Sequence, residues 1–64
     1  MKLVKKINGL EIIQITKRDT ERDSEFFSLT PGDYAVFDRE NGIIEISDSN
    51  LNCCIEFAEC YNDK

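Results

Sequence analysis

The sequence predicts a small α+β fold, in which an antiparallel sheet of four or five strands carries a C-terminal helix on one face. Asn-Gly dipeptides at 8–9 and 41–42 each lie between apolar, β-favouring runs, and this is the strongest local signal for a hairpin. Residues 51–61 repeat apolar side chains at helical spacing. With 64 residues, of which 41% are hydrophobic, the chain is expected to form one small domain, 1–64.

The first Asn-Gly turn is expected to be a two-residue turn, because both positions need positive φ and these two residue types accept it. The expected cross-strand pairs are Ile7 with Leu10, Lys6 with Glu11, and Val4 with Ile13. The Lys6–Glu11 pair would then be a favourable pair of opposite charges.

The middle of the chain supplies the second hairpin. Residues 18–25 are polar and dense in charge, so they predict a loop or a helix of at most two turns. Residues 26–29 predict a short fifth strand, which ends at a Pro-Gly turn at 31–32. Residues 34–37 and 43–46 are β-rich runs joined by a short loop with the second Asn-Gly.

The tail, residues 51–61, fits a helix or a strand. In a helix, apolar residues fall on one stripe, and residues 47–50 offer several N-cap candidates. In a strand, Glu59 would lie among apolar residues. The helix is favoured, and the alternative fold is a small all-β barrel.

The expected core combines one face of the sheet with the apolar stripe of this helix. It comprises Val4, Ile13, Ile15, Phe27, Leu29, Val36, Ile44, Ile46, Leu51, Cys54, Ile55 and Ala58. In the first hairpin a rival face has almost the same apolar content, and a slip of one residue in register would exchange the two faces. The rival set is Leu3, Ile7, Leu10 and Ile12.

The three cysteines are expected to be neither metal ligands nor a disulfide. A structural zinc site has four ligands, usually Cys and His, and the chain has three cysteines and no histidine, so a carboxylate would have to complete the set. In a helix, Cys60 lies about 10.5 Å along the axis from Cys53, too far for either bond. Cys54 is therefore read as a small core residue, and no cofactor or metal is expected. No nucleophile motif or phosphate-binding glycine loop is present, which favours a protein that is not an enzyme.

Charge is distributed unevenly along the chain. Residues 1–22 hold six basic and three acidic residues, for a net charge of +3. Residues 23–64 hold two basic and ten acidic residues, for −8, and the whole chain carries −5. This balance disfavours direct nucleic-acid binding and favours a charged protein partner. No apolar run approaches the ~20 residues that span a bilayer, so we expect a cytoplasmic protein without membrane association. We expect the protein to be a monomer or a homodimer.

The hypothesis that fits this charge is an interaction protein that inhibits a nucleic-acid-binding host protein by covering its basic surface. Regularly spaced carboxylates on a strand or a helix would face that surface, and opposite charge would speed the encounter. The candidate partner-binding residues are Asp38, Glu40, Glu45, Glu56, Glu59 and Asp63.

Two resemblances accompany this hypothesis. The stretch "LTPGDYAVFDRENGIIEIS", 19 of the 64 residues, resembles the second half of the swapped-hairpin transition-state regulators and MazE-type antitoxins. The resemblance implies an intertwined dimer that binds DNA, with Lys17, Arg18 and Arg22 as the basic residues, and a DNA-binding regulator is the alternative function. The matching positions are Leu29, Pro31, Gly32, Asp33, Val36, Gly42 and Ile44.

The second resemblance is one of size and charge. A very short, acidic, β-rich chain without catalytic motifs is similar to phage-encoded inhibitors of host defence, such as anti-CRISPR proteins and DNA mimics. This similarity implies inhibition by protein contact, and it assigns no individual site residue.

Overall fold

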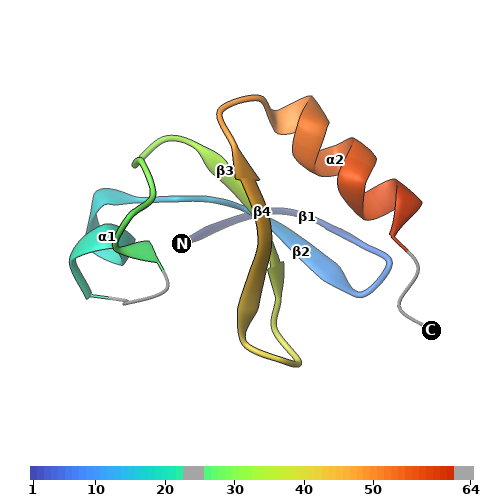
Figure 1. The fold of residues 1–64 in the computed structure, drawn as a ribbon, viewed down its shortest axis with the longest axis horizontal. Helices are drawn as coiled ribbons and strands as arrows, with labels where there is room; N and C mark the ends of the chain where they lie inside the picture. The colour runs from blue at the N-terminus through green and yellow to red at the C-terminus, as the bar shows by residue number, and fades with distance from the viewer. Residues whose placement is uncertain (23–25, 62–64) are drawn as a thin grey trace.

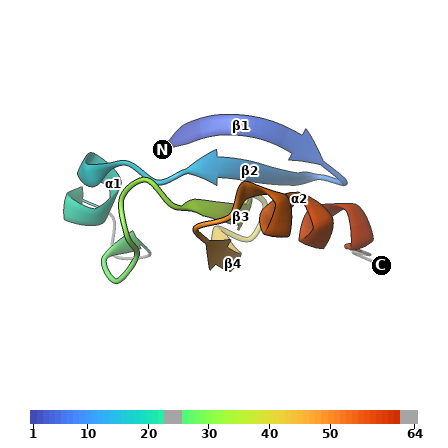
Figure 2. The ribbon, with the colours of Figure 1, turned by 90° about the horizontal axis from the view of Figure 1, so that it is seen from above.

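A computed structural model describes residues 1–22 and 26–61 of the chain. The elements are β1 (Lys2–Ile7), β2 (Leu10–Gln14), α1 (Lys17–Arg22), β3 (Tyr34–Asp38), β4 (Ile43–Asp48) and α2 (Leu51–Cys60). Figure 1 shows the two helices at opposite ends of the molecule, with the sheet between them, and Figure 2 shows the same separation from above.

The sheet is an open antiparallel meander with the strand order β1-β2-β3-β4, so β1 and β4 are its edges. The second hairpin crosses the first at a steep angle in Figure 1, as strong twist produces. The predicted α+β fold with a C-terminal helix is confirmed. Because residues 51–60 form α2 and the sheet stays open, the small all-β barrel is not the fold.

The first hairpin has the predicted turn but a different register beyond it. Asn8 and Gly9 have φ of 52° and 79°, and Ile7 pairs with Leu10 as expected. The predicted pair Val4–Ile13 is wrong, since Leu3 is the residue that pairs with Ile13. Val4 is an extra residue in β1, a bulge that no feature of the local sequence marks.

The second hairpin also contains a bulge. Val36 pairs with Ile46 and Phe37 with Ile44, so Glu45 is the extra residue of β4. Both bulges therefore lie in edge strands, where they increase the twist and make pairing with another chain less favourable.

The predicted fifth strand at 26–29 is wrong. The amide of Leu29 donates to the carbonyl oxygen of Phe26 at 3.0 Å, which closes a turn where a strand would bond to a neighbour. The Pro-Gly turn forms as predicted, with the amide of Asp33 donating to the oxygen of Thr30 at 3.1 Å and a φ of 95° at Gly32.

The turn at 26–29 places two adjacent phenylalanines in opposite environments. Phe26 is completely buried against the sheet, whereas Phe27, which the sequence placed in the core, is 79% exposed. A strand would also separate the two side chains, but the choice of which one is buried depends on where the segment crosses the sheet.

The core has two parts, one on each face of the sheet. On the helix face, the sheet packs on α2. The buried residues of this part of the core are Leu10, Ile12 and Val36 from the sheet and Cys54 and Ala58 from α2. The loop face packs under the segment that contains Phe26, and its buried residues are Ile13, Ile15, Phe26, Ala35 and Phe37.

Both rival faces of the first hairpin therefore contribute to the core through β2, which is buried on both sides. In contrast β1 is exposed along most of its length, and Val4, predicted in the core, is 42% exposed. The other predicted core residues are buried or partly buried: Ile13, Ile15, Leu29, Val36, Ile44, Ile46, Leu51, Cys54, Ile55 and Ala58.

The short helix α1 begins with a capping box. The side chain of Thr16 accepts from the amide of Asp19 at 3.3 Å, and the carboxylate of Asp19 accepts from the amide of Thr16 at 2.8 Å. These reciprocal bonds satisfy amides at the helix start, which favours the helical alternative for this polar segment.

The carboxylate of Glu11 is buried on the loop face of the sheet, where it forms an ion pair. Glu11 is only 8% exposed, and its two carboxylate oxygens accept from Arg39 at 2.7 and 2.9 Å. The Arg39 guanidinium also lies 5.4 Å from the ring centre of Phe37. Lys6 is opposite Glu11 in the register as predicted, but the direct hydrogen bonds of the carboxylate go to Arg39. This pair fastens β2 to the turn that follows β3.

The stability that the Glu11–Arg39 pair contributes depends on pH, because Glu11 can be protonated. Hydrogen bonding to Arg39 lowers the pKa of Glu11 below 4.5, and the charges of Arg39 and Lys6 act in the same direction against desolvation. A carboxyl group whose pKa is lower in the folded state stabilises the fold above its unfolded-state pKa, and this stabilisation is lost as the pH falls through the folded-state pKa.

Substitution of Arg39 by glutamine (Arg39→Gln) should therefore destabilise the fold at neutral pH, because a buried carboxylate loses two charge-assisted hydrogen bonds. Urea denaturation should show a stability difference from wild type that shrinks as the pH falls through the lowered pKa of Glu11, where its carboxylate becomes protonated. Lys5→Gln, which removes an exposed cation of β1, is the control and should show no such difference. A difference that is the same at all pH values would contradict this role of the pair.

The two phenylalanines provide a matched test of the loop face. Phe26→Ala should lower the free energy of unfolding by about 3–5 kcal/mol, because a fully buried ring is removed. Phe27→Ala should change it by no more than about 0.5 kcal/mol, since this ring is exposed. Thermal or urea denaturation of the two variants measures both values, and equal losses would show that the segment packs differently.

Candidate functional site

The structure separates the six predicted partner-binding acids into different environments. Glu40 lies exposed in the β3–β4 turn, and Glu56 and Glu59 lie exposed on α2. Glu45 is half-buried at the bulge of β4. Asp63 lies outside the described residues. The expected continuous row on the second hairpin does not form, because Asp38 is buried and the bulge interrupts the alternation of β4.

Asp38 holds the β3–β4 turn together. It is 7% exposed, and its carboxylate accepts from the side-chain and backbone nitrogens of Asn41 at 2.7 and 3.3 Å. Its backbone oxygen accepts from the amide of Gly42 at 2.7 Å. Asp38 is thus a turn-forming carboxylate at the end of an interior strand, whereas the predicted row of acids assumed an edge strand.

Residues 43–60, which form β4 and α2, contain acidic side chains and no basic one. Asn50 caps the helix by accepting from the amide of Asn52 at 2.9 Å, and the carboxylate of Asp48 accepts from the amide of Asn50 at 2.7 Å. Partial burial, followed by the negative charges of Asp48 and Glu56, raises the pKa of the Cys53 thiol.

We define the acidic surface as Asp48, Glu56 and Glu59. Glu59 lies one helical turn after Glu56, so both point to the same side of α2. The sequence of α2 contains no basic residue, and neither does that of β4. Asp48 was missed in the sequence analysis; its position two residues before the N-cap candidate Asn50 is the signal that could have identified it.

The basic residues lie elsewhere. Lys2, Lys5 and Lys6 are exposed on the edge strand β1, and Lys17, Arg18 and Arg22 are exposed on or at the end of α1. Figure 1 places α1 at the end of the molecule opposite to α2. The cations of α1 are therefore distant from α2, whereas the end of β1 lies near the end of α2, to which Asn8 is hydrogen-bonded.

The cysteines occupy three positions on α2. Cys54 is completely buried against the helix face of the sheet, and Cys53 and Cys60 are exposed. None of the three is disulfide-bonded. Within the described residues, no three His, Cys, Asp or Glu side chains are grouped closely enough to hold a metal ion.

A polar hollow of about 220 Å³ lies where both hairpin turns meet the end of α2. This hollow could not be predicted from local sequence, because its walls come from three distant parts of the chain. It is lined by Asn8, Gly9, Leu10, Asp38, Glu40, Asn41 and Tyr61.

No known protein family, no curated protein sequence and no solved structure matches this chain. In the described part of the chain, no helix has both the length and the apolar character needed to cross a membrane.

The burial of Cys54 predicts a loss of stability when a hydroxyl replaces its thiol. Cys54→Ser should lower the free energy of unfolding by roughly 1–3 kcal/mol, because a more polar group is buried in an apolar layer. Cys53→Ser, one residue away and exposed, is the matched control and should stay within about 0.5 kcal/mol of wild type. Urea denaturation under reducing conditions measures both, and an undiminished stability of Cys54→Ser would contradict the packing of α2.

Proposed function

We propose that this chain is a non-enzymatic, cytoplasmic interaction protein that inhibits a nucleic-acid-binding protein by covering its basic surface. The observation that carries the proposal is the acidic surface of Asp48, Glu56 and Glu59, on elements that contain no basic residue. A nucleic-acid-binding protein presents a basic surface to phosphates, and a folded surface of carboxylates is complementary to it.

The rigidity of the scaffold supports this proposal. Buried Cys54 and Ala58 anchor α2 to the sheet, and the cap at Asn50 determines where the helix begins. Carboxylates on an anchored helix need little further ordering on binding, so less conformational entropy is lost there than on a flexible acidic tail.

The bulges in both edge strands support recognition through side chains. A partner that added a strand to the sheet would need a regular edge, and Val4 and Glu45 interrupt the two edges. The acidic surface on α2 requires no such edge.

A second function, direct DNA or RNA binding, is favoured by the exposed cations of β1 and α1. This function would use Lys5, Lys6, Lys17 and Arg18. Phosphate contacts by these residues would make binding weaken steeply with salt. The two functions therefore predict opposite effects for two sets of charge reversals.

The deciding experiment uses labelled DNA and RNA probes, with and without a panel of purified nucleic-acid-binding proteins. We expect the wild-type chain to leave the probes unshifted by itself and to prevent at least one protein of the panel from binding its probe. Glu56→Lys with Glu59→Lys should abolish this inhibition, since the contacting surface changes sign, whereas folding should change by no more than about 0.5 kcal/mol.

Lys5→Glu with Lys17→Glu is the matched control, because it reverses the same number of exposed charges among the basic residues. It should retain inhibition. If the lysine reversals abolish activity while the glutamate reversals do not, or if the chain alone shifts a probe in a salt-dependent manner, the inhibitor proposal is wrong and direct binding is supported.

A further inference from the structure

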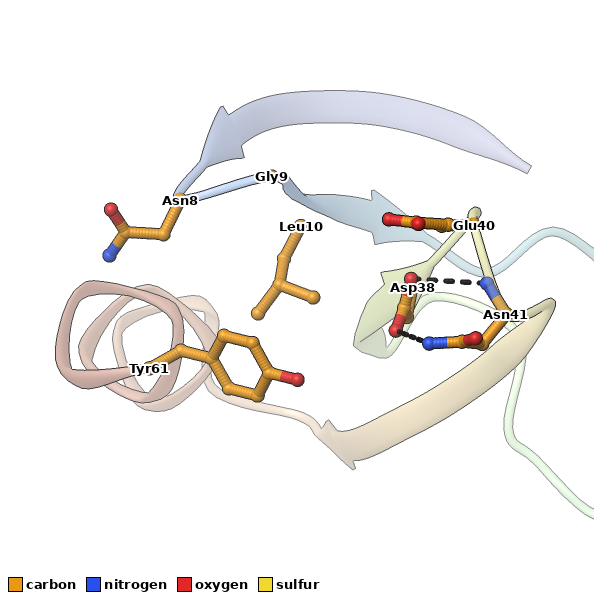
Figure 3. A pocket seen from close by; sticks show the side chains of 7 residues that line it. All are labelled: Asn8, Gly9, Leu10, Asp38, Glu40, Asn41 and Tyr61. Carbon is orange, nitrogen blue, oxygen red and sulfur yellow. Dashed lines mark hydrogen bonds between the residues drawn. The ribbon is translucent and has the colours of Figure 1, made fainter. Parts of the chain in front are cut away.

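The hollow between the two hairpin turns and the end of α2 has no role in the folding interactions described above. Its volume of about 220 Å³ compares with roughly 30 Å³ for one water molecule in the liquid, so it can admit a side chain of a partner. Figure 3 shows Tyr61 on the side of α2, Asp38 and Asn41 on the side of the β3–β4 turn, and Leu10 between them.

Two carboxylates give the hollow its charge. Asp38 is held at the wall by its bonds to Asn41, and each of its oxygens accepts only one of these bonds, which leaves acceptor capacity. Glu40 is exposed, and its carboxylate points toward the side of Gly9 and Leu10 in Figure 3. No basic side chain is among the described residues that line the hollow.

Arg39 does not neutralise this charge, although it lies between Asp38 and Glu40 in the sequence. Its guanidinium extends to the loop face, where it binds Glu11 and covers the ring of Phe37. The turn therefore directs its basic residue to the loop face and leaves its two acidic residues at the hollow.

The opposite wall is aromatic and is firmly attached. The ring of Tyr61 lies 6.0 Å from the ring of Phe57, centre to centre. The side-chain amide of Asn8 donates to the backbone oxygens of Ala58 and Glu59 at 2.8 and 3.3 Å, which ties the end of α2 to the β1–β2 turn. These bonds hold the end of α2 beside the β1–β2 turn, and both segments line the hollow.

We propose that this hollow accepts an arginine side chain of the basic partner. The inference rests on the proposed function and names the group that the chain would recognise. A guanidinium is planar, donates several hydrogen bonds in a fixed fork, and stacks on aromatic rings. The carboxylates of Asp38 and Glu40 would accept those bonds, and the ring of Tyr61 would lie against its plane.

The test is an NMR titration of the full-length, ¹⁵N-labelled chain with N-acetyl-arginine amide. We expect saturable shifts of the amide signals of Gly9, Leu10 and Asn41, which line the hollow. N-acetyl-citrulline amide, which has nearly the same shape but no charge, should produce no saturable shifts.

Two variants localise the binding. Glu40→Gln should weaken binding of the arginine probe about tenfold or more, because a charge-assisted bond is lost. Glu45→Gln removes a carboxylate of β4 that does not line the hollow, and it should bind the probe like wild type.

The outcomes distinguish this inference from the proposed function. Shifts that are spread over α2, equal binding of the citrulline probe, or an unaffected Glu40→Gln would overturn the arginine site, even if the chain inhibits a nucleic-acid-binding protein. Saturable binding at the hollow that Glu40→Gln weakens would support the site, even if every nucleic-acid-binding protein of the panel is unaffected.

Discussion

The burial of β2 on both faces is the constraint on which the rest of the structure depends. Leu10 and Ile12 face α2, whereas Ile13 faces the segment that carries Phe26. A strand in this position needs a partner strand on each side and a cover above and below. With only 64 residues available, α2 provides one cover and a short turn provides the other. This explains how so small a chain forms two apolar layers around one sheet.

Glu11 is the charged residue in this buried strand, and its requirement for a partner organises the β3–β4 turn. A buried carboxylate without a partner would cost far more than an exposed one, so Arg39 crosses to the loop face and binds it. The neighbouring acids Asp38 and Glu40 then remain at the hollow on the other side. An interaction needed for folding thus also leaves a negatively charged hollow beside the end of α2.

The division of charge follows from the same architecture. The edge strand β1 is largely exposed and carries lysines, which together with its bulge discourage pairing with other chains. The other edge, β4, leads into α2, and both elements contain acidic but no basic residues. The two edge strands of the sheet therefore differ in charge, which would help to orient a charged partner before contact. The proposed inhibitory function depends on this separation more than on the net charge of −5.

Local chemistry in the sequence determined the turns at Asn8-Gly9 and Pro31-Gly32, the hairpin at Asn41-Gly42, and the helical tail. Each of these depends on residues close together in the chain, so each could be predicted. The exposed positions of Glu40, Glu56 and Glu59 followed for the same reason. Only the tertiary structure decided that Phe26 is buried in place of Phe27, that Val4 and Glu45 are bulges, and that Asp38 is buried. It alone assembled the hollow, because Asn8, Asp38 and Tyr61 are distant in sequence, and their proximity results from packing on both faces of β2.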